Sequence, residues 1–276
     1  MKISIIHKTS KHALSTMILA VSILLGACSE TPGDLQAGDD NIQFINNKAG
    51  ASLNSQAAID LEVTSAHNHT NNEHLFELST KTIGAGWSTI KFNNASHSDH
   101  FLLVYKVPQE ALDAADTANE PILQHWYNGV TVPFQEEFNP YIKGDISYGE
   151  FVNNLIGTIS TTAPWFLDPG AVTMGGPGIT SSGESSITTV KLEPGTYVVE
   201  CYVKDENQEF HSYNGMLDIL EVKAANTDED EPKATMKVSI TQNGLDIPQN
   251  IRPGLHTVEN ILRGAARIWI RTFAWS

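Results

Sequence analysis

The sequence predicts an all-β fold, a sandwich of two sheets with a helical insertion, followed by a second sandwich unit that is cut short. Short segments of alternating polar and apolar residues, separated by turn-forming residues, fill most of the chain after its first 56 residues. One stretch, about residues 108–169, has helical spacing instead. A short motif near residue 83 recurs near residue 251, which indicates an internal repeat.

Residues 1–27 have the features of a bacterial lipoprotein signal peptide. Three lysines precede an apolar run that is too short to span a membrane as a helix. The run ends in the letters LGAC at Cys28, which resemble the lipobox of bacterial lipoproteins. That resemblance implies cleavage before Cys28, lipidation of this cysteine, and, because Ser29 follows it, the outer membrane of the cell envelope, on its periplasmic or surface face. The alternative is an ordinary secretory signal in which the cysteine stands by chance.

The composition of the chain limits its partners. Residues 28–56 are polar, glycine-rich and acidic, which predicts a flexible tether. The net charge of −15 argues against a nucleic-acid partner and leaves contact with the membrane to the lipid anchor. If Cys28 is lipidated, Cys201 has no disulfide partner within the chain, which holds two cysteines. A lone thiol in an oxidising compartment must be buried, metal-bound or reactive.

The main domain is predicted at residues 57–224. Ile59, Leu61 and Val63 alternate and share one face of the first strand. The later run HFLLVYKVP is apolar on both faces, which predicts a central strand that ends at Pro108.

The insertion at about residues 108–169 carries its own helix signals. Ser147 stands three residues before Glu150, the spacing of a capping box. Phe151, Leu155 and Ile159 then recur at helical spacing. No nucleophile elbow, zinc-protease helix or Cys-x-x-Cys pair occurs anywhere in the chain, so the sequence does not indicate an enzyme.

The segment from Cys201 to Met216 holds three residue types that bind soft metals. Asp205 to Gln208 form a polar turn signal between two apolar stretches. A hairpin folded about Glu206 would set Cys201 opposite His211, with Cβ atoms roughly 4.5–5.5 Å apart. One metal ion could bridge such a pair, since bonds from metal to sulfur or imidazole nitrogen are about 2.0–2.3 Å long.

At these residues the chain resembles the cupredoxins, the blue-copper family of Greek-key β-sandwiches. The stretch GWSTIKFNNASHSDHFLL is similar to the one in which a strand ends in asparagine and the next supplies a histidine ligand, here His100. LEPGTYVVEC is similar to the strand that delivers the cysteine ligand, Cys201, and HSYNGM repeats the family's H-x4-M spacing at His211 and Met216. The resemblance implies copper bound by two imidazoles, a thiolate and a weak thioether.

The spacing between the cysteine and the second histidine differs from that of the family, so two functions remain possible. Nine residues separate Cys201 from His211, where the family usually has only a few, so the chain resembles a subset with a longer loop. The first function is copper binding for electron transfer to a redox partner protein, or for copper handling. The alternative is a metal-free envelope module that binds a partner through its insertion, with Cys201 and Met216 as core side chains.

A second histidine cluster, His67, His69 and His74, lies in the segment HNHTNNEH. On a strand, His67 and His69 would share one face, which suits a surface site for Cu(II) or Zn(II). The alternative is a solvated loop without metal.

The last part of the chain is predicted as an acidic linker, residues 225–233, and a truncated second cupredoxin-like unit, residues 234–276. The motif I-x-x-G-x-x-T-[IV] starts at Ile83 and again at Ile251. About 40 residues are too few for a complete sandwich of ~100. From about residue 260 the chain is basic and free of acids, which indicates either an amphipathic tail on a membrane surface or the product of a frameshift.

Overall fold

The computed structural model describes residues 59–68, 73–224, 231, 233–241, 244–251, 254–262 and 272–275. The predicted signal peptide, Cys28, the tether, His69 and most of the linker lie outside the described residues. Within the described part of the chain, no helix is long and apolar enough to cross a membrane.

The first sheet has the strand order β2-β1-β4-β7. Its strands are β1 (Leu61–Asn68), β2 (Glu73–Leu78), β4 (Gly86–Asn94) and β7 (Ser185–Leu192). β1 pairs antiparallel with β2 and parallel with β4, and β4 pairs antiparallel with β7. Leu61 and Val63 are fully buried on one face of β1, as their alternation predicts. Ile59, predicted to share that face, precedes the strand and is exposed.

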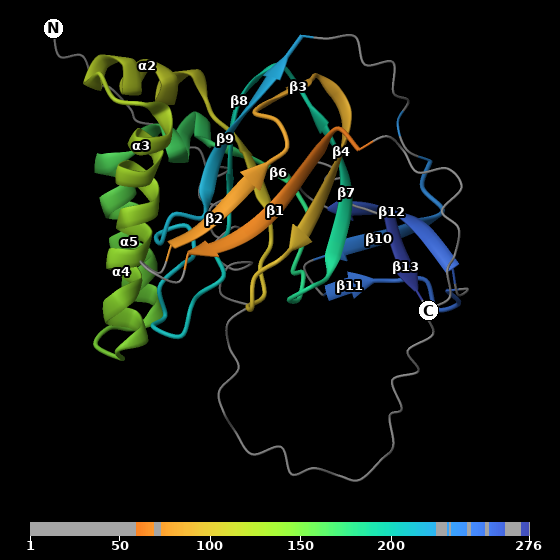
Figure 1. Ribbon diagram of the computed structural model, residues 1–276. Coiled ribbons are helices and arrows are strands. Elements are labelled where there is room, and N and C mark those ends of the chain that lie inside the picture. The colour runs from red at the N-terminus through yellow and green to blue at the C-terminus, as the bar shows by residue number, and fades with distance from the viewer. Residues whose placement is uncertain are drawn as a thin grey trace, which may run out of the picture.

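The second sheet has the strand order β3-β9-β8-β5-β6. Its strands are β3 (Thr82–Gly84), β9 (Leu217–Lys223), β8 (Gly195–Glu200), β5 (Leu103–Lys106) and β6 (Val172–Gly175). β5 lies between β8 and β6 and is covered on both faces, so the predicted central strand is confirmed. The two sheets make the predicted β-sandwich (Figure 1).

The insertion forms a helical layer on the outer face of the second sheet (Figure 1). Its helices are α2 (Gln109–Ala118), α3 (Ile122–Trp126), η1 (Tyr127–Thr131), α4 (Val132–Ile142), α5 (Tyr148–Thr162) and η2 (Phe166–Gly170). The capping box predicted at Ser147 and Glu150 is present at the start of α5. α4 continues without a break from η1, and because Pro133 has no N–H to donate, the backbone oxygen of Gly129, four residues earlier, accepts a hydrogen bond from Thr162 Oγ1 at 2.7 Å instead.

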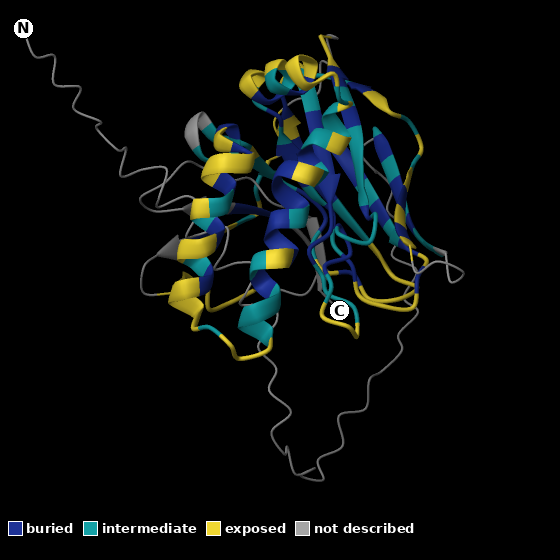
Figure 2. Cartoon of the chain, turned by 90° about the vertical axis from the view of Figure 1, so that its left-hand side faces the viewer, coloured by how far each residue is buried: buried dark blue, intermediate teal, exposed yellow. Residues whose placement is uncertain are grey.

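Two hydrophobic cores lie on the two sides of the second sheet. The core between the sheets includes Leu61, Ile90, Val199, Cys201 and Met216, all fully buried. The other core packs the apolar stripes of the helices against the second sheet. Figure 2 shows this segregation, with exposed residues on the outer faces of the helices and buried ones facing the sheet. Each large apolar side chain so buried stabilises the fold by roughly 1.5–3 kcal/mol.

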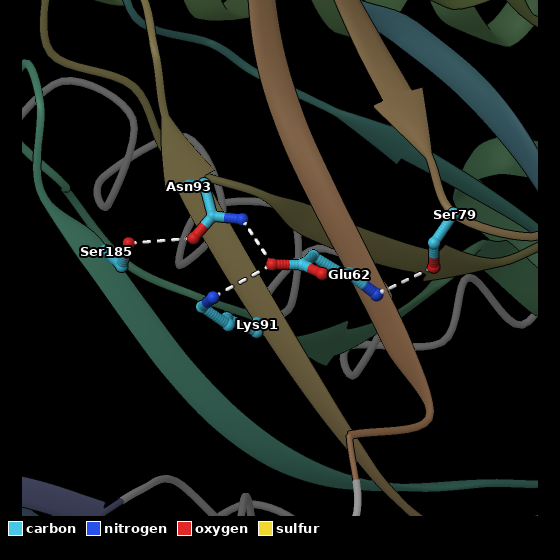
Figure 3. A network of polar contacts seen from close by, with 5 residues as sticks. All are labelled: Glu62, Ser79, Lys91, Asn93 and Ser185. Carbon is cyan, nitrogen blue, oxygen red and sulfur yellow. Dashed lines mark hydrogen bonds and ion pairs between the residues drawn. The ribbon is translucent and has the colours of Figure 1, made fainter.

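A polar network holds the outer face of the first sheet in register (Figure 3). One carboxylate oxygen of Glu62 on β1 accepts hydrogen bonds from Lys91 Nζ at 2.8 Å and from Asn93 Nδ2 at 2.7 Å, both on β4. Ser185 Oγ on β7 donates to Asn93 Oδ1 at 2.8 Å. These donors lower the pKa of the Glu62 carboxyl. The network links three neighbouring strands, β1, β4 and β7.

The C-terminal part forms a separate sheet of order β11-β10-β12-β13. Its strands are β10 (Met236–Thr241), β11 (Gly244–Asp246), β12 (Gly254–Leu262) and β13 (Thr272–Trp275). β10 and β12 are parallel with Met236 opposite Val258, just as Leu61 lies opposite Ile90 in the first sheet. The strand order and directions therefore repeat those of β2-β1-β4-β7, while the extent of a second unit stays a prediction.

Candidate metal centre

His100 is positioned by a buried asparagine at the end of β4. Asn94 Nδ2 donates to the backbone oxygens of Ser98 and Thr180, each at 2.7 Å, and its Oδ1 accepts from Ser65 Oγ and Ser96 Oγ, each at 2.8 Å. These bonds fold the loop between β4 and β5 back toward the sheet. The backbone of His100 then forms a two-way bridge with Thr180, with N···O distances of 3.2 and 2.7 Å.

Cys201 and His211 stand on the two arms of a hairpin between β8 and β9. The predicted turn is confirmed, since the backbone N–H of Gln208 donates to Asp205 O and that of Asp205 donates to Glu209 O. Lys204 pairs with Phe210, so the hairpin folds about Asn207 and not about Glu206 as predicted.

The base of this hairpin is closed by backbone hydrogen bonds. The N–H of Ser212 donates to Cys201 O at 2.9 Å, and the N–H of Met216 donates to His211 O at 2.8 Å. The N–H of Cys201 in turn donates to Met216 O at 3.2 Å. These bonds bring the two arms, and with them Cys201 and His211, to one end of the core between the sheets.

Three donor atoms converge there in a small triangle. Cys201 Sγ lies 3.8 Å from His100 Nδ1 and 3.8 Å from His211 Nδ1, and the two Nδ1 atoms are 2.8 Å apart. All three side chains are fully buried, and so is Met216, the fifth residue after His211. Donors about 2.0–2.3 Å from one ion lie roughly 3–4 Å from one another, so the two sulfur–nitrogen sides already match a single metal ion. The nitrogen–nitrogen side of 2.8 Å is a hydrogen-bond distance and must widen slightly when an ion binds.

Burial sets the protonation of these groups. It raises the pKa of the Cys201 thiol to about 12 and lowers the pKa of His100 to about 4, with the neighbouring His74 and His67 adding to the shift of His100. Burial, together with His100, lowers the pKa of His211 to about 2. At neutral pH the metal-free imidazoles are therefore neutral, ready to offer lone pairs, and a metal ion must displace the thiol proton in order to bind Cys201.

A third histidine, His74, belongs to the same cluster. Its ring stacks on that of His211 with centroids 4.1 Å apart, and one ligand atom from each of His74, His100 and His211 lies within 4.8 Å of the others. The backbone N–H of His74, in β2, donates to Asn214 O at 2.9 Å, which ties β2 to the hairpin. Gly215 permits this approach, because a Cβ there would lie 3.3 Å from the His74 carbonyl oxygen.

The structure thus rearranges the predicted sites. His100, Cys201 and His211 come together as expected, although 101 positions separate His100 from Cys201. His74, grouped in the sequence with His67 and His69 as a surface site, is 4% exposed and lies in the buried centre. His67 stacks on its other face at 4.3 Å. The cross-strand pairing of His67 with His74 is the signal that could have revealed this, but the residues between the two strands hide the register.

Comparisons with known proteins place copper proteins among the similar solved structures. No protein-family model and no curated protein matches the chain. A reduced auracyanin from Roseiflexus castenholzii is 17% identical, with a TM-score of 0.30, over 59% of this chain and 94% of its own. Auracyanin A, a blue copper protein from Chloroflexus aurantiacus, is 17% identical with a TM-score of 0.30, and the match covers 59% of this chain and 96% of auracyanin A. A mutant of amicyanin is 12% identical with a TM-score of 0.24, and the match covers 61% of this chain and 85% of amicyanin. Values this low assign no role to any residue.

Proposed function

We propose that this chain is a cupredoxin-like copper-binding protein of the cell envelope, serving one-electron transfer or copper handling. The observation that carries the proposal is the buried triangle of Cys201 Sγ, His100 Nδ1 and His211 Nδ1, with sides of 3.8, 3.8 and 2.8 Å. A thiolate with two imidazoles is a donor set that selects copper among the common transition metals.

Each residue has a distinct task under this proposal. Cys201, His100 and His211 would hold the copper ion, and Met216 would add a weak thioether donor that tunes the redox potential. A bound copper ion supplies one-electron redox chemistry. His100 is oriented by Ser98, whose Oγ lies 3.2 Å from His100 Nε2, so that Nδ1 faces the other donors. Full burial of the four side chains excludes water from the centre.

A copper titration of the metal-free protein tests the proposal. We expect one tightly held copper per chain and an intense thiolate-to-copper absorption band. The Cys201→Ser variant should lose that band. His97→Ala serves as a matched control, because His97 is an exposed imidazole outside the triangle, and it should keep both the stoichiometry and the band. A wild-type protein that retains no copper after loose ions are removed would refute the proposal.

One further observation favours the alternative, a metal-free module that binds a partner through the insertion. A hollow of about 550 Å³ lies between α3 and the turn at residues 213–217, with Leu123, Tyr127 and Tyr213 in its lining. Tyr127 Oη donates to the backbone oxygen of Tyr213 at 3.0 Å, which links the insertion to the hairpin of the centre. If the protein holds no copper, this hollow is where a ligand search begins.

The location in the envelope rests on the N-terminal sequence. The lipobox-like segment ending at Cys28 supports lipid attachment there, and Ser29 supports the outer membrane. Mass spectrometry of the N-terminal peptide from the membrane fraction tests this part separately. An acylated peptide that begins at Cys28 is the expected result, and an unmodified peptide cleaved elsewhere would contradict it.

A further inference from the structure

The centre holds one more imidazole than the proposed copper site uses. His74 comes from β2, and its side chain is 4% exposed at the same end of the core as the triangle. Its ring lies 4.1 Å from that of His211 and 5.7 Å from that of His100, centroid to centroid. Burying a polar ring inside a core costs free energy, so three clustered imidazoles call for a chemical explanation.

The geometry of His74, His100 and His211 fits a second donor set. One nitrogen from each lies within 4.8 Å of the others. Two nitrogens bound to one ion at about 2.0–2.1 Å are at most roughly 4 Å apart, so the group closes on an ion if His74 moves by less than about 1 Å. The hydrogen bond from the His74 N–H to Asn214 O already holds β2 against the hairpin that carries His211.

The chemistry of the two sets differs. The set with Cys201 and Met216 is soft and favours copper in its reduced state, whereas three imidazoles suit borderline divalent ions such as Cu²⁺ and Zn²⁺. The two sets share the residues His100 and His211, so the two candidate sites overlap.

We propose that His74 is a third imidazole donor, and that His74, His100 and His211 form an all-nitrogen site for a divalent transition metal that overlaps the thiolate site. The inference extends the proposed function through the two shared histidines, but the site that it defines does not need Cys201. His67 stacks on the outer face of His74, is partly buried, and lies outside the group of three. It therefore offers a control with the same ring contact and no donor role.

The test is made in the full chain with Cys201→Ser, where the thiolate site is absent. Cu²⁺ affinity is measured by chelator competition, and the number of bound imidazole nitrogens is counted by pulsed electron paramagnetic resonance. The Cys201→Ser protein should bind one Cu²⁺ through three imidazoles. Adding His74→Phe should leave two imidazoles and weaken binding more than about 100-fold, since loss of partners outside the metal's own shell already costs about 10–100-fold. Adding His67→Phe should leave the nitrogen count at three.

Three results would overturn the inference: no Cu²⁺ binding by Cys201→Ser, two imidazoles in that protein, or equal affinity with and without His74. Circular dichroism checks that each variant folds, and His74→Gln replaces His74→Phe if the latter does not. The wild-type thiolate band reports on the proposed function independently. If the wild type shows the thiolate-to-copper band but replacing His74 changes neither the imidazole count nor the Cu²⁺ affinity of Cys201→Ser, only the present inference is wrong. If Cys201→Ser binds Cu²⁺ through three imidazoles but the wild type shows no thiolate-to-copper band, only the proposed thiolate site is wrong.

Discussion

Glu200 is a carboxyl group at the end of β8, completely buried next to Cys201. It accepts hydrogen bonds from Tyr202 Oη and, at 3.4 Å, from Trp126 Nε1. Burial nevertheless dominates and raises the pKa of Glu200 from 4.5 to about 7. Since the proton stays on in the folded protein where the unfolded chain has lost it, folding stability must fall as pH rises through this interval.

The Glu200→Gln variant isolates this effect, because the amide is close in shape to the neutral acid and cannot ionise. A shift from 4.5 to about 7 corresponds to roughly 3 kcal/mol at 1.36 kcal/mol per pKa unit. Part of it is already lost at pH 5, so between pH 5 and pH 8 the variant should gain about 2–3 kcal/mol relative to wild type. The buried histidines titrate alike in both proteins, so their contribution cancels from the difference.

Urea unfolding of the metal-free proteins at pH 5, 6, 7 and 8 measures this gain. Glu62→Gln is the control, since Glu62 has a lowered pKa on the outer face of the sheet and should show no gain toward pH 8. If the stability difference between Glu200→Gln and wild type is the same at all four pH values, the raised pKa of Glu200 is wrong.

Three further predictions concern the frame of the centre. Gly215→Ala should lower the free energy of unfolding by about 1–3 kcal/mol in urea titrations, because φ is +100° there and the new Cβ meets the β2 backbone. Gly157→Ala, in open space on α5, should not lower it, and an equal loss in both would contradict the argument. Asn94→Ala should lower the free energy of unfolding by about 1–3 kcal/mol, because the buried hydrogen-bond partners of Asn94 lose their partner. The same variant should bind copper more weakly in chelator competition, and an unchanged copper affinity would rule out a positioning role for Asn94. In metal-free Glu200→Gln protein, the free energy of unfolding should fall as pH drops from 6.5 toward 4. The reason is that His100 and His211 become protonated in the unfolded chain but stay neutral in the folded protein, where their pKa values are lowered. A free energy of unfolding in urea that does not change over this pH range would contradict the prediction.

Local signals in the sequence predicted the parts of the fold that local chemistry determines. The capping box at Ser147 and the stripe of Phe151, Leu155 and Ile159, spaced about one turn apart, lie in one helix, and all are found as expected. The polar turn after Cys201 also formed, although its centre is shifted by one residue.

The pairing of strands that lie far apart in the sequence was harder to predict. The parallel pairing of β1 with β4 and the docking of β2 on the hairpin leave no local signature, because they depend on how separate segments meet in space. The consequence was largest at His74, whose neighbours in sequence indicated a surface cluster and whose neighbours in space are His211 and His100.

X-ray absorption at the copper edge of the loaded full-length protein tests the central claim most directly. A copper ion held by Cys201, His100 and His211 predicts one sulfur and two or three imidazole nitrogens directly bound to the metal, all within about 2.0–2.3 Å. The sulfur contribution should disappear in Cys201→Ser. A wild-type spectrum with only nitrogen and oxygen neighbours would contradict the claim that the thiolate binds copper.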